Sequence, residues 1–331
     1  MEKRRAVVVV TGASAGVGRA VVREFAREGA RIGLIARGRE RLEAAALEVE
    51  ELGGEALVLP CDVADASAVE AAAFEVERKW GRIDIWVNNA MSTVFAPIME
   101  VRPEEFRRVM EVTYLGYVHG TQAALRRMKP HDEGTIVQVG SALAFRSIPL
   151  QSAYCAAKHA IVGFTESLRT ELIHERSRVH VTEVHLPAVN TPQFDWSRSR
   201  MPRQAQPVPP IFQPEVVARG IVWAAHHRRR SLWLGLPTAK AIFAEKFIPG
   251  LLDRYLGRIG YRKQMTDEPR DVHRGDNLMA PRPGDFGAHG RFDDRSKGRS
   301  PFVWANLHRG LLATFAGLFV AGAAAWRRAS A

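Results

Sequence analysis

The chain has 331 residues, of which 46% are hydrophobic, so it is long enough to bury a large core and is not typical of a disordered protein. Its 47 Lys and Arg residues outnumber 36 Asp and Glu residues and give a net charge of +11, but they form no stripe with interleaved aromatic residues. This scatter does not favour nucleic-acid binding. Cys61 and Cys155 lie far apart and the histidines form no ligand pattern, so we predict no metal site and a reducing, cytoplasmic compartment.

Apolar runs alternate with helical patterns along the first 235 residues. The first run follows a charged N-terminus directly and lacks the longer apolar core and cleavage site of a signal peptide, so we interpret it as a buried strand. Strand and helix in alternation predict an α/β fold, in which helices cover both faces of a doubly wound parallel sheet. The predicted strands are residues 6–11, 31–36, 55–60, 83–88, 134–140, 179–185 and 231–235.

The segment "TGASAGVG" joins the first predicted strand to a helical pattern. Gly12, Gly16 and Gly18 let the backbone turn tightly and approach a pyrophosphate, whose charge then lies at the N-terminus of the helix. Ser14 and Val17 belong to the same loop. Glycines also occur in strand-to-helix turns that bind nothing, but the position between a strand and an amphipathic helix favours a dinucleotide site.

The stretch "QSAYCAAKHA" places Tyr154 four residues before Lys158, on one face of a predicted helix. A free tyrosine has a pKa near 10 and is a poor base at neutral pH unless a nearby positive charge favours the phenolate. Lys158 can supply that charge. Alone, this pair is more typical of an ordinary helix, but Ser141, at the end of the fifth predicted strand, and the glycine loop favour a catalytic group.

Together these motifs resemble the classical short-chain dehydrogenase/reductases over residues 1 to about 235. The resemblance implies a Rossmann-like fold and an NAD(P)-dependent oxidoreductase. In such an enzyme Tyr154 would exchange a proton with the substrate oxygen, Ser141 would hydrogen-bond that oxygen, and Lys158 would hold the nicotinamide ribose. It also implies a homodimer. Further cofactor contacts implied by "CDV", "NNA" and "LPAVNTP" are Asp62, Val63, Asn89, Ala90 and Thr191.

The chain departs from the family pattern at several positions. Thr113, in "VTYLG", occupies the place of an Asn that helps to hold a proton-relay water, and Met91 follows "NNA" where Gly is usual. An alternative function is therefore a cofactor-binding regulatory module with little catalysis. The intact group of Ser141, Tyr154 and Lys158 favours an enzyme.

The end of the second predicted strand bears on the choice of cofactor. NAD-preferring proteins place an acidic residue there to bind the ribose hydroxyls. This chain has neutral Ala36 followed by Arg37, whose guanidinium can bind a 2′-phosphate through two parallel hydrogen bonds. We therefore predict NADP rather than NAD, with an ordinary surface arginine as the alternative interpretation.

A proline-rich insert, residues 191–214, follows the sixth predicted strand. Its aromatic residues predict either a lipophilic pocket for a bulky ketone, aldehyde or secondary alcohol, or packing of the insert against the domain, and the two are equally supported. The aromatic and aliphatic residues considered for this pocket are Phe95, Leu143, Phe145, Phe194, Trp196 and Phe212.

Composition divides the chain into a catalytic domain (1–265), a polar Gly/Pro-rich linker (266–302) and an apolar C-terminal segment (303–331). Residues 310–326 carry no charge and would form a helix of about 25 Å, slightly shorter than a bilayer core. Two interpretations remain open: a membrane anchor with the catalytic domain on the cytoplasmic side, which we slightly favour, and a helix docked on protein.

Overall fold

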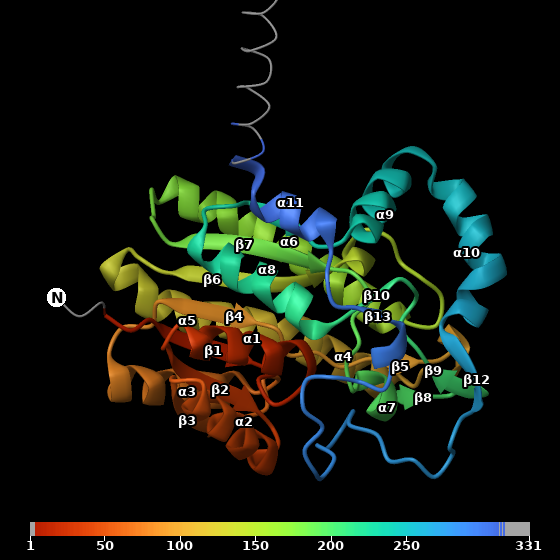
Figure 1. Ribbon diagram of the computed structural model, residues 1–331, viewed down its shortest axis with the longest axis horizontal. Helices are drawn as coiled ribbons and strands as arrows, with labels where there is room; N and C mark the ends of the chain where they lie inside the picture. The colour runs from red at the N-terminus through yellow and green to blue at the C-terminus, as the bar shows by residue number, and fades with distance from the viewer. Residues whose placement is uncertain (1–3, 311, 313, 315–331) are drawn as a thin grey trace, which may run out of the picture.

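The computed structural model describes residues 4–310, 312 and 314. Seven parallel strands form one sheet in the order β11-β7-β6-β4-β1-β2-β3 (Figure 1). This confirms the predicted doubly wound α/β fold, and each predicted strand agrees with the structure to within two residues at either end. The strands are β1 (Val7–Thr11), β2 (Arg31–Ala36), β3 (Glu55–Pro60), β4 (Ile85–Asn88), β6 (Thr135–Ser141), β7 (His180–Leu186) and β11 (Ser231–Trp233).

Strand β1 shows how the sheet is buried on both faces. Its side chains alternate, so that Val8 and Val10 pack with α1, α2 and α8, whereas Val7 and Val9 pack with α3, α5 and α6. A central strand of this kind must be apolar throughout, which explains the uninterrupted valine run. The helices in these two layers are α1 (Gly16–Arg27), α2 (Arg39–Glu51), α3 (Ala66–Trp80), α5 (Gly116–Met128), α6 (Ser152–His174) and α8 (Pro214–His226).

The parallel register brings the predicted functional loops to one edge of the sheet. Strands β6 and β7 pair from Thr135 opposite His180 to Ser141 opposite Leu186, so Ser141 lies at the carboxyl end of β6. The loops after β1, β2, β3 and β4 leave the sheet at the same edge, which is where ligands bind in open α/β sheets. Short helical segments nearby are η1 (Ile98–Glu100), α4 (Pro103–Met110), the π-helical turn η2 (Glu111–Leu115), η3 (Lys129–His131) and η4 (Ala142–Ala144).

Three small two-stranded sheets join the insert to distant parts of the chain. The insert contains α7 (Gln193–Trp196), and its strand β10 pairs with β13, which lies near the C-terminal end of the segment predicted as a linker. The blue trace in Figure 1 follows this segment beneath α7 and back toward α11. The three sheets pair β5 (Val94–Phe95) with β8 (Arg198–Ser199), β9 (Arg203–Ala205) with β12 (Met265–Pro269), and β10 (Ile211–Phe212) with β13 (Ser296–Lys297). The short helix η5 (Asp293–Arg295) comes directly before β13.

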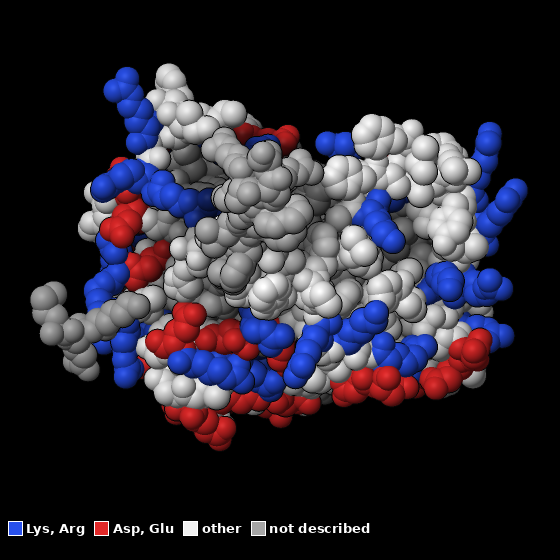
Figure 2. Space-filling view, turned by 45° about the horizontal axis from the view of Figure 1, so that its top comes forward, with Lys and Arg blue, Asp and Glu red and all other residues white. Residues whose placement is uncertain are grey.

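Helices α9 (Leu236–Phe247) and α10 (Pro249–Lys263) form a projection at the edge of the molecule. In Figure 2 the region that they occupy, on the right, is largely uncharged with Lys and Arg at its margin, whereas Asp and Glu gather along the lower edge. Large apolar side chains are exposed along both helices, namely Leu236, Phe243, Phe247, Leu251, Tyr255 and Tyr261.

Helix α11 (Pro301–Leu307) packs on α8 and is attached by Val303, which is buried, and by Asn306, which donates to the carbonyl oxygen of Trp233. The uncharged segment 310–326 lies almost entirely outside the described residues. Among the residues that the structure describes, no helix combines the length and the apolar character needed to cross a bilayer.

Candidate active site

A cleft of about 410 Å³ lies at the carboxyl edge of the sheet, a volume in the range of small-molecule sites. Most of the residues predicted for cofactor binding and catalysis line it, whereas Gly18 and Thr113 do not. The predicted residues in the wall of the cleft are Gly12, Ser14, Gly16, Val17, Arg37, Asp62, Val63, Asn89, Ala90, Ser141, Tyr154, Lys158 and Thr191.

The glycine loop has the shape of a cradle for a diphosphate. Gly12 and Gly16 adopt φ angles of +69° and +58°, which favour glycine. A Cβ atom at Gly18 would lie 2.0 Å from the carbonyl oxygen of Gly12, so this glycine allows α1 to pack closely on the loop. No side chain caps the N-terminus of α1 at Ala15. Its positive end fits the negative charge of a dinucleotide.

Thr11 connects the loop after β4 to the loop after β1 through hydrogen bonds. Its hydroxyl accepts hydrogen bonds from the backbone N–H groups of Asn89 and Ala90, at 2.9 and 3.1 Å. The Asn89 side chain in turn donates to the carbonyl oxygen of Thr11 at 3.0 Å. The side-chain amide of Asn89 therefore supports the wall of the cleft through the backbone.

Asp62, which the resemblance assigns to the adenine, is held in place by two neighbours. Its carboxylate accepts the backbone N–H of Ala64 at 3.0 Å and pairs with the guanidinium of Arg108. These contacts fix the loop after β3 at the far end of the cleft from Tyr154.

The three predicted catalytic side chains meet in one part of the cleft. Ser141 ends β6, and its hydroxyl accepts the backbone N–H of Leu143 at 3.1 Å. Tyr154 and Lys158 lie one turn apart on α6, and the Lys158 Nζ atom is 5.7 Å from the centre of the Tyr154 ring. The structure thus brings together the group that the sequence spacing predicted.

Lys158 has a polar partner that the sequence analysis missed. Its ammonium is only 2% exposed and donates to the Tyr117 hydroxyl at 2.9 Å and to the carbonyl oxygen of Val139 at 2.7 Å. Burial lowers the pKa of Lys158 to about 7. Tyr117 lies one helical turn after Thr113, and this spacing is the signal that could have identified it.

Tyr154 is protonated at neutral pH in this structure. Burial raises its pKa above the usual value of 10, and a hydrogen bond from Ser141 opposes that shift only partly. The expected lowering of this pKa by Lys158 is not found. Burial dominates the pKa of Tyr154, and the Lys158 ammonium donates to Tyr117 and Val139 rather than to the phenol.

Thr113 is fully hydrogen-bonded away from the cleft. Its hydroxyl donates to the carbonyl oxygen of Ser92 and accepts the N–H of the same residue, both at 3.0 Å. Thr113 lies in the π-helical turn η2, a geometry that often occurs near functional sites. The side chain therefore fixes the loop after β4, and it makes no hydrogen bond to Lys158.

The other end of the cleft is mostly apolar. Of the residues considered for a lipophilic pocket, Leu143, Phe194 and Trp196 line the cleft. Phe95 and Phe212 are instead buried in the core, where Phe95 packs beside Phe194. Phe145 packs against the buried ring of His185, at 4.7 Å between ring centres. Additional apolar residues in the wall are Ile148, Pro207, Val208, Pro209, Pro237 and Ala241.

Arg37 follows β2 at the end of the cleft that the resemblance assigns to the adenosine. Its guanidinium donates to the carbonyl oxygens of Asn277, Leu278 and Met279, three consecutive residues of the segment predicted as a linker. Sequence reasoning assigned no contact to that segment, which has few large apolar residues.

Comparison with known proteins agrees with this geometry. The family model described as short chain dehydrogenase matches residues 6–201, more than half of the chain. The chain belongs to the short-chain dehydrogenase/reductase family. It is an oxidoreductase with a Rossmann-like fold, which confirms the predicted enzyme over the alternative of a regulatory cofactor-binding module. A curated relative, described as the uncharacterized oxidoreductase YxnA of Bacillus subtilis, is 34% identical over 80% of this chain and 74% of the relative.

Two further members of the family bear on chemistry. A protein described as fatty acyl-CoA reductase of Acinetobacter baylyi is 28% identical over 68% of this chain and 75% of the relative. The solved structure of an alcohol dehydrogenase from Thermococcus sibiricus, complexed with 5-hydroxy-NADP, is 29% identical and superimposes with a TM-score of 0.60. That likeness covers 70% of this chain and 96% of the other.

Proposed function

We propose that the protein is an NADP-dependent oxidoreductase that transfers hydride between the nicotinamide and a carbonyl or secondary alcohol carbon of a lipophilic substrate. The observation that carries the proposal is the convergence of Ser141, Tyr154 and Lys158 in a cleft that also contains the glycine loop. Bound NADP would supply or accept the hydride. The residues of this chain then have to hold the substrate oxygen and move one proton.

Tyr154 is the proton-transferring group in this proposal. Its buried phenol holds its proton at neutral pH and can donate it to a carbonyl oxygen as that oxygen gains negative charge. The Ser141 hydroxyl can hydrogen-bond the same oxygen and fix its position. In the opposite direction the phenol must first lose its proton, and burial, which raises its pKa, opposes that loss while the Lys158 ammonium donates to Tyr117 and Val139.

The choice of NADP rests on charge at the adenosine end. Ala36 and Arg37 line the cleft after β2, and Ala36 offers no carboxylate that would repel a 2′-phosphate. The guanidinium of Arg37 keeps its charge because its partners are neutral carbonyl oxygens. The Thermococcus sibiricus neighbour, which was solved with an NADP derivative, supports the same choice.

The lipophilic substrate is supported by the wall of the cleft beyond Tyr154. That wall is built from Leu143, Phe194 and the prolines of the insert, which offer apolar surface and few hydrogen-bonding groups. The similarity to a fatty acyl-CoA reductase is consistent with a substrate that carries an alkyl chain.

Replacing Tyr154 with Phe tests the mechanism. The variant should bind NADPH nearly as well as the wild type but lose at least about a hundredfold in turnover, because only the proton-transferring oxygen is removed. Tyr114→Phe makes the same chemical change on a ring that packs against Phe164 outside the cleft, and it should retain turnover. Turnover is measured as NADPH oxidation with a panel of ketones and aldehydes. Wild-type turnover by Tyr154→Phe on any accepted compound would contradict the mechanism.

A further inference from the structure

Residues 270–293, which we term the tail, run across the adenosine end of the cleft. Asn277 and Pro281 form part of its wall. Between them, Leu278 is 0% exposed and acts as an apolar anchor. This side chain packs in a cluster with Val94, Ala96, Val109 and Ala153. The tail is therefore attached to the catalytic domain through a buried contact beside the cofactor cleft.

The tail orients Arg37 without neutralising it. The Arg37 guanidinium donates at 3.2 Å to the carbonyl oxygen of Leu278 and at 3.1 Å to that of Met279. Carbonyl oxygens are neutral, so the arginine keeps its full positive charge. Three tail carbonyls thus hold the side chain at the cleft and leave its charge available to an anion.

One guanidinium nitrogen of Arg41 has no hydrogen-bond acceptor among the described residues, although the side chain lines the cleft. Arg41 lies in the first turn of α2 and is 6% exposed, yet its buried Nη2 atom makes no hydrogen bond with any residue that the structure describes. Its guanidinium lies 5.0 Å from the centre of the Trp196 ring and 4.9 Å from that of Phe286, a tail residue. A buried guanidinium nitrogen without an acceptor is costly, so the site favours an anionic ligand beside Arg37.

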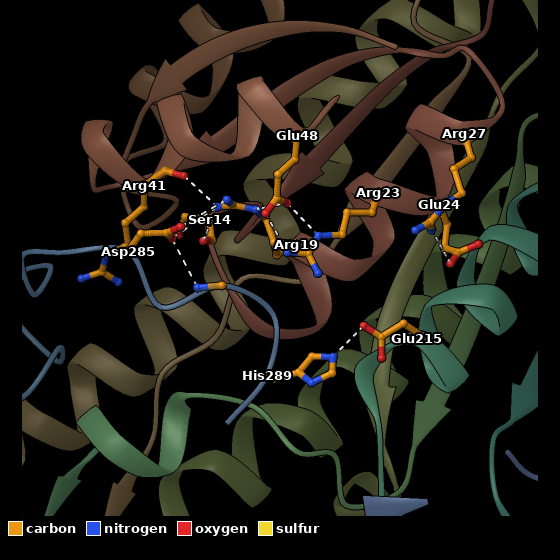
Figure 3. Close-up of polar contacts among 11 residues, drawn as sticks. Ser14, Arg19, Arg23, Glu24, Arg27, Arg41, Glu48, Glu215, Asp285 and His289 are labelled. Atoms are coloured by element: carbon orange, nitrogen blue, oxygen red, sulfur yellow. Dashed lines mark hydrogen bonds and ion pairs between the residues drawn. The ribbon is translucent and has the colours of Figure 1, made fainter. Parts of the chain in front are cut away.

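The tail is also bonded to the glycine loop. The backbone N–H of Gly16 donates to the carbonyl oxygen of Gly287 at 3.0 Å. Figure 3 shows Arg19 at the centre of this junction, where it donates to the carbonyl oxygens of Ser14 and Arg41 and pairs with Asp285 of the tail at 3.4 Å. The loop that cradles a diphosphate and the helix that carries Arg41 are thereby linked to one tail segment.

On the other side, the tail is bonded to the insert over the substrate end. Arg274 donates to the carbonyl oxygens of Phe194 and Ser197, both at 2.9 Å. The backbone N–H of Asn277 donates to the carbonyl oxygen of Trp196 at 3.0 Å. The tail and helix α7 therefore form one continuous cover over both ends of the cleft.

We propose that tail residues 277–287 form the outer wall of the adenosine site and, together with Arg41, complete a subsite for the 2′-phosphate of NADP. The inference rests on the proposed function in its choice of ligand, because a phosphomonoester supplies the acceptor that the Arg41 Nη2 atom lacks. Since the cover spans the cleft, it has to open for the cofactor to enter or leave.

Arg41→Met tests the phosphate subsite in the full-length protein. Fluorescence titration should show NADPH binding weakened by about tenfold or more, the value of a lost charge-assisted hydrogen bond, with a much smaller effect on NADH. Arg39→Met is the matched control, because Arg39 is on the same helix but is exposed and pairs only with Glu43 at 3.7 Å. It should change neither affinity by more than about twofold.

Phe286→Ala and limited proteolysis test the cover. Phe286 is half-buried, so its truncation should leave the fold intact while stopped-flow measurements show faster NADPH release. Trypsin cleavage at Arg274 and Arg291 of the wild type should slow when NADPH is bound, whereas cleavage at the exposed Arg254 and Arg258 of α10 should not.

The outcomes separate the two proposals. If the wild type prefers NADPH but the Arg41 and Phe286 variants bind and release it normally, the role of the tail is wrong and the proposed cofactor stands. If NADPH and NADH bind equally to the wild type, the cofactor choice and the phosphate subsite both fail. Tail cleavage that is unchanged by either cofactor overturns the cover.

Discussion

Replacing Lys158 with Met should stabilise the cofactor-free protein at neutral pH. Burial lowers the pKa of Lys158 from 10.5 to about 7, so holding the ammonium charged in the folded protein costs about 5 kcal/mol below pH 7. Met removes this cost and also removes two hydrogen bonds, to Tyr117 and Val139, worth roughly 1–3 kcal/mol together. The expected net gain in the free energy of unfolding near pH 6 is therefore about 2–4 kcal/mol.

The advantage of the Met variant should decrease as pH rises. Below about pH 7 both the folded and the unfolded wild type carry the charge on Lys158, so the full cost applies. Between pH 7 and 10.5 the folded protein has lost this proton and the unfolded chain retains it, so the wild type gains stability with pH. Urea unfolding of both proteins between about pH 6 and pH 10 measures the difference. If the difference in unfolding free energy between the two proteins did not change with pH, burial would not lower the pKa of Lys158, and the reasoning would be refuted.

Three other predictions concern the cofactor, the tail and the C-terminus. Arg37→Ala should weaken NADPH binding by about 1.5–3 kcal/mol and NADH binding much less, and equal titration curves for the two cofactors in the wild type would contradict this. Although burial opposes the shift, Glu215 and Asp293 raise the pKa of His289. Its stabilising contribution should therefore be present below pH 6.5 and be lost as pH rises through the folded-state pKa, so the unfolding free energies of the wild type and His289→Asn should converge above that pH. In cell fractionation, full-length protein should sediment with membranes and a chain that ends at Gly310 should not; full-length protein in the detergent-free supernatant would exclude an anchor.

The sheet could be predicted because burial on both faces leaves a simple pattern. In β1 the run of four valines has to fill two helix layers at once, so an apolar run between turn signals identified the strand. The grouping of Ser141, Tyr154 and Lys158 in one cleft was also predictable. Tyr154 and Lys158 are one helical turn apart, and the resemblance related Ser141 to them by a fixed separation in sequence.

The electrostatics and the outer wall of the site could not be predicted in the same way. The pKa of Tyr154 depends on its burial and on the partners that Lys158 adopts in the folded protein, which no local spacing specifies. Arg37 donates to residues about 240 positions later in the chain. The polar composition of that segment predicted a linker. In the structure the segment packs through single apolar residues such as Leu278 and through backbone carbonyl oxygens, and composition reveals neither kind of contact.

The junction between Gly16 and Gly287 constrains the order in which the enzyme can be made functional. The glycine loop leaves the ribosome early, but its tail partner is synthesised only after both helix layers and the insert. A growing chain can pack its sheet before that point, since domains fold as units during synthesis. The contact between loop and tail then closes late, because it requires a loop of more than two hundred residues to be ordered. A chain that ends before Gly287 therefore contains a folded sheet but lacks the tail partner of the glycine loop.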